Sequence, residues 1–406
     1  VSPRPSSPRR VPTRCCHSRR DPIEMRLLLK RWLCVLALCK ALGLRVQPGR
    51  GRACSGMRRT AADVAMVERP ALRKVVVTGL GSLTSLGHDA HTFFDNLVAG
   101  KCGITEVSRF DAEKADVPSR IASEVRDFDI GEYWTMKEAK RYDRYAHYAM
   151  AAAKIAVKDS GIDLDAVEKK RFGVLIGSGV GGLEAVEDSC RILSTKGAKR
   201  ITPFLLPSII GNTAGSMVAI QLGAKGPNFG VVSACATGTH AIGEALKYIQ
   251  YGQADVVLAG GSEASITPLG FAGFSSMRAM CTSSNDSPQT ASRPFDADRA
   301  GFVMGEGAGV LLLESEEHAL ARGATIYCEL AGYAATCDAH HITAPHPEGE
   351  GMADCLTDAM ANAGVAPEQV GYINAHGTST PLNDKFETMA YKRAFGEHAP
   401  KIKISS

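Results

Sequence analysis

Two residues of this 406-residue chain have the type and setting for nucleophilic chemistry, Cys235 and His376. Cys235 lies in "SACATGTH", after the apolar run 229–233 and before a helical pattern, so a strand-to-helix turn would place its sulfur at a helix N-terminus. There the helix dipole and unpaired backbone N–H groups lower the pKa of a thiol. A cysteine in an apolar run is more often a core residue, so the nucleophile hypothesis needs a partner.

His376 is the candidate partner. It lies in "NAHGTST", where it follows a short apolar run at the position that ligand sites of open α/β sheets favour. Beside Gly377 and the hydroxyls 378–380, its imidazole could stabilise negative charge developing on a thioester carbonyl oxygen. On the residues alone, a structural histidine is an equally open interpretation.

The elements that must position these residues alternate along the chain from Lys74 onward. Near-continuous Val/Ile/Leu runs separated by helical patterns predict an α/β architecture with a parallel sheet buried on both faces. The pattern then repeats: "IYCELAGYAATCDA", "MADCLTDAMANAGV" and "VGYINAHGTST" follow the order of "KVVVTGLGSLTSLG", "MAAAKIAVKDSGID" and "RFGVLIGSGVGG". This repeat predicts a duplicated unit in which the final "KIKISS" corresponds to the strand before Cys235.

Charge and composition exclude several functional classes. Residues 1–60 hold 15 Lys and Arg against two acidic residues, which leaves 32 basic and 41 acidic residues afterwards, a net charge of −9. We therefore expect no nucleic-acid partner for the body of the chain. The longest apolar run in the leader, 32–39, is too short to span a membrane, and its Arg-rich, acid-poor composition is typical of an organelle-targeting segment. For residues 1–24, translation of an upstream region before Met25 is the alternative.

Cofactor and metal motifs are weak. "GSGVGG" at 177–182 fits a dinucleotide fingerprint, but no acidic residue follows about 20 positions later, so we expect no NAD. The histidines of "DAHHITAPHP" lack the spacing of a closed metal site, and we expect no metal and no other cofactor. Twelve cysteines without CxxC spacing predict free thiols in a reducing compartment.

"VVVTGLG", "SACATG", "SRPFDADRAGFVMGEGAG" and "NAHGTST" together resemble the β-ketoacyl-[acyl carrier protein] synthases, condensing enzymes of type I/II, from about Lys74 to the end. The resemblance implies a thiolase-like five-layer αβαβα sandwich of two duplicated halves, and a homodimer. It implies an acyltransferase of fatty acid biosynthesis, in which Cys235 accepts the acyl chain and His376 is the first histidine of a Cys-His-His triad. We expect a leader over 1–72, an N-terminal half over 73–324 and an incomplete C-terminal half over 325–406.

The resemblance also assigns supporting residues and an acyl carrier protein as partner. Several of these assignments have an equally open alternative from the residues alone. It is core packing for Phe274, a solvated helix start for Asp384 and Glu387, and a solvated helix face for the basic residues. Val180 and Phe274 match the acyl pocket, Thr343, Thr378 and Thr380 the pantetheine and malonyl side, Asp384 and Glu387 the acidic pair after the histidine, and Lys137, Lys140, Arg141 and Arg278 the carrier-docking patch.

Three alternatives stay open at this point. If Ser406 is the true end, the family's second histidine, its lysine and its Gly-rich oxyanion loop are missing, and we expect impaired condensation or an unstable fragment. A non-catalytic partner subunit is a second hypothesis, which retention of Cys235 and His376 disfavours. A ketosynthase domain of a polyketide synthase is the third. For localisation we expect the plastid, with the mitochondrion as the alternative.

Overall fold

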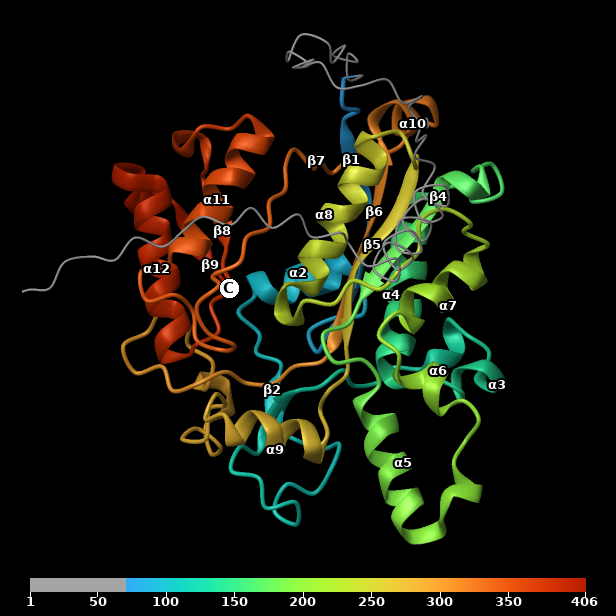
Figure 1. The fold of residues 1–406 in the computed structure, drawn as a ribbon, viewed down its shortest axis with the longest axis vertical. Coiled ribbons are helices and arrows are strands. Elements are labelled where there is room, and N and C mark those ends of the chain that lie inside the picture. The colour runs from blue at the N-terminus through green and yellow to red at the C-terminus, as the bar shows by residue number, and fades with distance from the viewer. Residues whose placement is uncertain (1–70) are drawn as a thin grey trace, which may run out of the picture. The chain divides into compact units, whose positions relative to one another are not determined.

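A computed structural model describes residues 71–406, shown in Figure 1. The targeting leader expected over 1–72 therefore lies, up to residue 70, outside the described residues. Among residues 71–406, no helix is long and apolar enough to cross a bilayer. The seven cysteines of this region are all free thiols, as expected.

A five-stranded sheet forms the centre of the fold, in the order β4-β5-β6-β1-β7. The parallel sheet expected from the sequence is present only in part, because only β4 and β5 pair in parallel. The sequence pattern missed β6, which runs antiparallel between β5 and β1 and makes the sheet mixed. The strands are β1 (Val75–Leu83), β4 (Phe172–Gly177), β5 (Val256–Glu263), β6 (Gly307–Ser315) and β7 (Cys328–Glu329).

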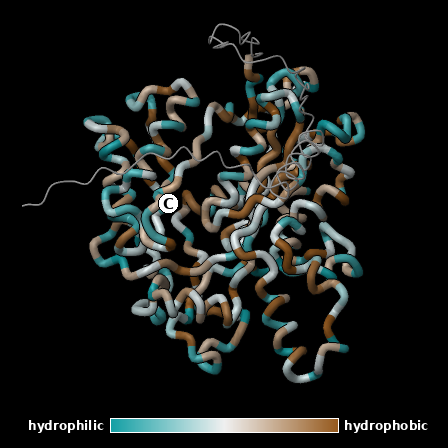
Figure 2. The backbone as a smooth tube through the Cα atoms, in the orientation of Figure 1, coloured by the Kyte–Doolittle hydropathy of each residue, from teal (hydrophilic) through white to brown (hydrophobic). Residues whose placement is uncertain are grey.

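Helices cover both faces of this sheet, as the buried strands predict. Along β5, Val256 and Leu258 pack with the alanine-rich α4 (Arg144–Ser160), whereas Val257 and Ala259 pack with α8 (Thr237–Gln250). Successive side chains of a strand point to opposite faces, so α4 and α8 lie on opposite sides of the sheet. Figure 2 shows hydrophobic residues concentrated along these central strands.

The C-terminal region repeats part of this plan. β8 (Tyr372–Asn374) and β9 (Lys403–Ser405) pair in parallel, and α11 (Glu350–Ala363) packs on α12 (Pro381–Phe395). In the first half, the segment before Cys235 lies beside β4 in the same way, since Gly226 N–H donates to the Phe172 carbonyl at 2.8 Å. The arrangement agrees with the predicted duplication.

The strand predicted at 229–233 is not present as a strand. The backbone hydrogen bonds to β4 come just before that segment, at Gly226 and Pro227, and Phe229 and Val232 are 37% and 62% exposed. Residues 229–233 make no backbone hydrogen bond to β4, so they lack the ladder that defines a strand. The remaining elements are α2 (Ala90–Val98), β2 (Ile104–Glu106), β3 (Ile121–Ser123), α3 (Met136–Ala139), α5 (Leu183–Lys196), α6 (Leu205–Ile209), α7 (Thr213–Leu222), α9 (Pro268–Ser276) and α10 (Glu316–Ala321).

Candidate active site

Cys235 lies in a tight turn, residues 233–237, that leads directly into α8; we call it the nucleophile turn. Ala234 has a φ of 49°, in the left-handed region that a non-glycine residue occupies at a cost of about 1 kcal/mol. The reversal at Ala234 leaves Cys235 exposed to solvent at the start of the helix. The structure thus has the predicted turn into a helix, although the predicted strand before it is absent.

Glycines on β4 and β5 let the nucleophile turn approach the sheet. A methyl group on Gly177 would overlap Thr237 Cγ2 and the Val231 carbonyl oxygen, and one on Gly261 would lie only 3.2 Å from Gly238 Cα of α8. The position of Cys235 is therefore fixed by close backbone packing, which larger residues at these glycines would prevent.

His376 lies next to Cys235. A hydrogen bond with the imidazole lowers the pKa of the Cys235 thiol and outweighs the opposing effect of desolvation, and the same hydrogen bond raises the pKa of His376. Both shifts favour a thiolate–imidazolium pair, the reactive form of a cysteine nucleophile. The structure brings together the two residues that the sequence singled out from opposite halves of the chain.

A buried carboxylate fixes the loop that carries His376, residues 375–380, which we call the histidine loop. Glu387 on α12 accepts hydrogen bonds from the backbone N–H of His376 at 2.7 Å and of Gly377 at 2.9 Å. The Tyr391 hydroxyl and the Asn383 amide donate to the same carboxylate. The interpretation of Glu387 as a solvated helix residue is wrong, since it is 6% exposed.

Asp384, on α12 just after the histidine loop, joins this region to the first half of the chain. It is 1% exposed, so its interpretation as a solvated residue at a helix start is wrong too. It accepts from the backbone N–H of Phe295 at 2.8 Å and lies 3.6 Å from Arg299 Nε. The buried Ser379 adds a second link, because Arg293 N–H donates to its hydroxyl and Gly301 N–H to its carbonyl. The segment 293–301 thereby holds the histidine loop in place.

The remaining predicted site residues occupy more open positions. Thr378 and Thr380 share a hydrogen bond of 2.8 Å in the histidine loop, whereas Thr343 lies in an exposed loop. Val180 is 49% exposed, and Phe274 packs edge-on against Phe302 in a small apolar cluster. Of the basic residues, Lys137, Lys140 and Arg278 are exposed, and the Arg141 guanidinium stacks on the Phe204 ring at 4.9 Å.

Sequence reasoning missed Glu263, the last residue of β5. Its carboxylate accepts from Gly179 N–H at 2.9 Å and Val180 N–H at 3.0 Å, and its negative charge acts on Cys235. The available signal was an acidic residue after the "AGG" of a buried strand, at the carboxyl end where sites of α/β sheets form.

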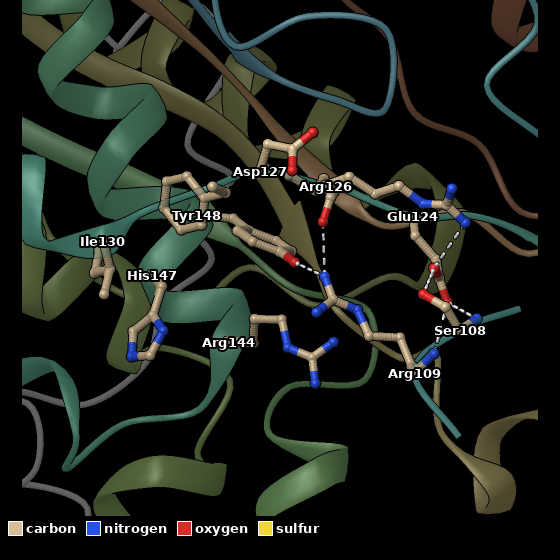
Figure 3. A pocket seen from close by; sticks show the side chains of 11 residues that line it. Ser108, Arg109, Glu124, Arg126, Asp127, Ile130, Arg144, His147 and Tyr148 are labelled. Carbon is tan, nitrogen blue, oxygen red and sulfur yellow. Dashed lines mark hydrogen bonds and ion pairs between the residues drawn. The ribbon is translucent and has the colours of Figure 1, made fainter. Parts of the chain in front are cut away.

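A cavity of about 520 Å³ lies elsewhere, lined partly by the start of α4 (Figure 3). Its lining includes no residue of the nucleophile turn or the histidine loop. Arg109 and Arg144 contact the buried carboxylate of Glu306, and Arg126 contacts that of Glu124, so its cations are already paired. We interpret this network as a structural link between α4 and the chain around it.

The family is decided by sequence profiles. "Beta-ketoacyl synthase, N-terminal domain" matches residues 72–319, and "Beta-ketoacyl synthase, C-terminal domain" matches residues 327–406. The chain belongs to the β-ketoacyl synthase family. The resemblance predicted from "SACATG" and "NAHGTST" is confirmed.

The sequence of this β-ketoacyl synthase is similar to those of curated condensing enzymes that share one name. It is 50% identical to the "3-oxoacyl-[acyl-carrier-protein] synthase 2" of Synechocystis sp. over 334 residues, covering 82% of this chain and 80% of that protein. The protein of the same name from Staphylococcus aureus strain COL is 49% identical with the same coverage. These relatives confirm the predicted enzyme class, an acyltransferase-type condensing enzyme.

Solved ketosynthases share the fold of this β-ketoacyl synthase. A structure described as "AntDE:AntF (apo): type II PKS acyl-carrier protein in complex with its ketosynthase bound to the hexaketide" matches with a TM-score of 0.75 and 35% identity, over 82% of this chain and 80% of that one. A β-ketoacyl synthase from Burkholderia phymatum matches with a TM-score of 0.74 and 33% identity, over 80% and 79%. The predicted thiolase-like α/β fold class is confirmed.

Proposed function

We propose that this chain is the condensing enzyme of fatty acid elongation, which joins an acyl chain to malonyl-[acyl carrier protein]. The observation that carries the proposal is the pairing of Cys235 with His376 in a family member 50% identical to a 3-oxoacyl-[acyl-carrier-protein] synthase 2. The polyketide ketosynthases are matched at lower identity, 35%, which favours the fatty acid substrate. A non-catalytic role is disfavoured because a subunit without chemistry has no need of an activated thiol.

In the first step, the Cys235 thiolate attacks the acyl thioester carbonyl. A new carbon–sulfur bond forms to Cys235 as the carbon–sulfur bond to the carrier breaks, and the departing carrier thiolate takes up one proton. His376 hydrogen-bonds the thiolate before attack and is close enough to the reacting atoms to stabilise developing negative charge. Covalent catalysis lets one site use the two carrier-linked substrates in turn.

In the second step, malonyl-carrier loses carbon dioxide and its α-carbon attacks the acyl-enzyme. The carbon–carbon bond forms as the carbon–sulfur bond to Cys235 breaks, and one proton restores the thiol. The product is a 3-oxoacyl-carrier two carbons longer. Val180 beside the nucleophile turn and the Thr378–Thr380 pair are positioned to contact the acyl and pantetheine portions of these substrates.

The carrier partner follows from the exposed cations. The body of the chain is acidic overall, but Lys137 and Lys140 at α3 and Arg278 after α9 are exposed. Their local positive charge would steer an acidic carrier protein toward this surface. In the AntDE:AntF structure a ketosynthase is in complex with its acyl-carrier protein. We propose the same class of partner here.

We also propose a homodimer through the uncovered edge beside β4. Phe229, Val232 and Ile220 are 37%, 62% and 68% exposed there, and an apolar edge with unpaired backbone groups favours pairing with a second chain. Light scattering on the wild type and on Val232→Asp tests this, with a dimer expected only for the former.

For localisation, the Arg-rich leader supports the plastid, which a fluorescent fusion tests.

Intact-mass spectrometry tests the catalytic proposal. Incubation with acyl-carrier should add one acyl group to Cys235, and subsequent malonyl-carrier should remove it and yield the 3-oxoacyl-carrier. Cys235→Ala is the matched control and should acquire no acyl group. A folded wild type that takes up no acyl group would overturn the proposal.

A further inference from the structure

We propose that Glu263 is a positioning residue for acyl transfer, which holds the loop 178–181 so that Val180 borders the acyl site beside Cys235. We call residues 178–181 the valine loop. This inference rests on the proposed function only for the identity of the substrate. The contacts that support it belong to the described structure.

The Glu263 carboxylate accepts four hydrogen bonds. One oxygen accepts from the backbone N–H of Gly179 and Val180, at 2.9 and 3.0 Å. The other accepts from the hydroxyls of Ser178 at 3.2 Å and Ser265 at 2.9 Å. Because Glu263 ends a central strand of the sheet, the loop is anchored to a rigid element.

The valine loop has a second layer of support. Ser178 Oγ, which donates to Glu263, also accepts from Gly181 N–H at 2.9 Å. One carboxylate thus organises three consecutive backbone N–H groups, directly at Gly179 and Val180 and through Ser178 at Gly181. Loss of the carboxylate would leave the N–H groups of Gly179 and Val180 without this acceptor, would free the Ser178 hydroxyl that holds Gly181, and would release the loop.

The valine loop lies directly against the nucleophile turn. A methyl group added to Gly179 would lie 3.1 Å from Glu263 Oε2 and 3.2 Å from the Ala234 carbonyl oxygen. Glu263, the loop and the residue before Cys235 are therefore packed together. A shift of the loop would move the half-exposed Val180 side chain relative to the thiol, and so change which acyl chains fit.

The charge of Glu263 also reaches the nucleophile. Its negative charge raises the pKa of Cys235, opposing the larger lowering by the hydrogen bond with His376. Glu387 and Asp384 act on His376 from α12, and His240, on the first turn of α8, hydrogen-bonds Ser233 rather than the thiol. No arginine or lysine among residues 71–406 forms an ion pair with Glu263, so its charge is not offset locally.

Alkylation of Cys235 tests the proposal without requiring condensation. Iodoacetamide and an N-dodecyl iodoacetamide would be reacted with wild type, Glu263→Ala and Glu263→Gln, and modification of Cys235 followed by peptide mass spectrometry. For Glu263→Ala, we expect the dodecyl-to-iodoacetamide rate ratio to change about tenfold, because the loop that borders the acyl site is released. Glu263→Gln retains an acceptor for the backbone N–H groups, so its ratio should stay within about twofold.

The pH dependence separates positioning from bulk stability. In Glu263→Gln the alkylation profile should move to lower pH by about half a unit, because a negative charge near the thiol is removed. Asp188→Ala, an exposed carboxylate on the neighbouring α5 that pairs with Arg191 of the same helix, is the matched control and should change neither ratio nor profile. If Glu263→Ala does not fold, Ser265→Ala, which removes one donor to the same carboxylate, should itself change the ratio relative to the wild type. Folded variants with wild-type ratios and profiles would overturn the inference, whatever the outcome of the condensation assay.

Discussion

The two halves of this β-ketoacyl synthase hold their reactive residues by different physical means. Cys235 is fixed by backbone packing, in a strained turn that glycines on β4 and β5 allow to approach the sheet. His376 is fixed by hydrogen bonds from the backbone of its loop to the buried carboxylate of Glu387. The nucleophile should therefore be sensitive to added volume, and the histidine to lost charge.

The largest effect should come from Glu387→Ala. Four donors would lose one buried acceptor, and we expect a loss of about 3–5 kcal/mol in the free energy of unfolding. With the histidine loop displaced, acyl transfer to Cys235 should fall about 100-fold. Urea unfolding and intact-mass kinetics measure the two. Exposed Glu397→Ala is the control, and equal effects of both variants would contradict this account.

The counterpart in the other half is Gly177→Ala. The new methyl group would overlap Thr237 and the Val231 carbonyl, so we expect a destabilisation of about 3 kcal/mol together with slower alkylation of Cys235. Gly273→Ala on α9 is the matched control, because nothing lies within 4 Å of that position. Thermal unfolding and alkylation rates provide the measurements. A Gly177→Ala protein as stable as the control would show that the turn is not sterically fixed.

The electrostatic link between the halves predicts a pH effect. The hydrogen bond with His376 lowers the pKa of Cys235, so the wild-type thiolate persists below the pH at which an ordinary cysteine is protonated. In His376→Gln the thiol pKa should rise, moving the alkylation profile up by about one pH unit and slowing the reaction near neutrality about tenfold. Exposed Cys190 is an internal control whose rate should not change. An unshifted Cys235 profile would contradict the pairing.

Local sequence signals predicted the two reactive residues but not how they are held. Small residues around Cys235 and the Gly-hydroxyl cluster after His376 are local signals, and the structure brings both residues together. The burial of Asp384 depends on Phe295 and Arg299, some 85 to 89 positions earlier, and no periodicity reveals such a contact. β6 escaped prediction because its "GAGVLLLES" follows glycines that read as a loop. The segment 229–233 has strand composition but makes no backbone hydrogen bonds to β4, and composition does not report such pairing.

The smallest effect tests the strain at the nucleophile turn itself. Ala234 has a φ of 49°, where glycine is free of the Cβ penalty, so Ala234→Gly should stabilise the protein by about 1 kcal/mol. Ala236, two positions later, has a φ of −82°, and Ala236→Gly should instead destabilise it by about 0.5–1 kcal/mol. The free energies of unfolding of the two variants are measured in denaturant and compared, which cancels the effect of deleting one methyl group that both share. Opposite signs would locate strain at the residue before Cys235, whereas equal signs would mean that the turn is unstrained and that packing by glycines alone determines the position of the thiol.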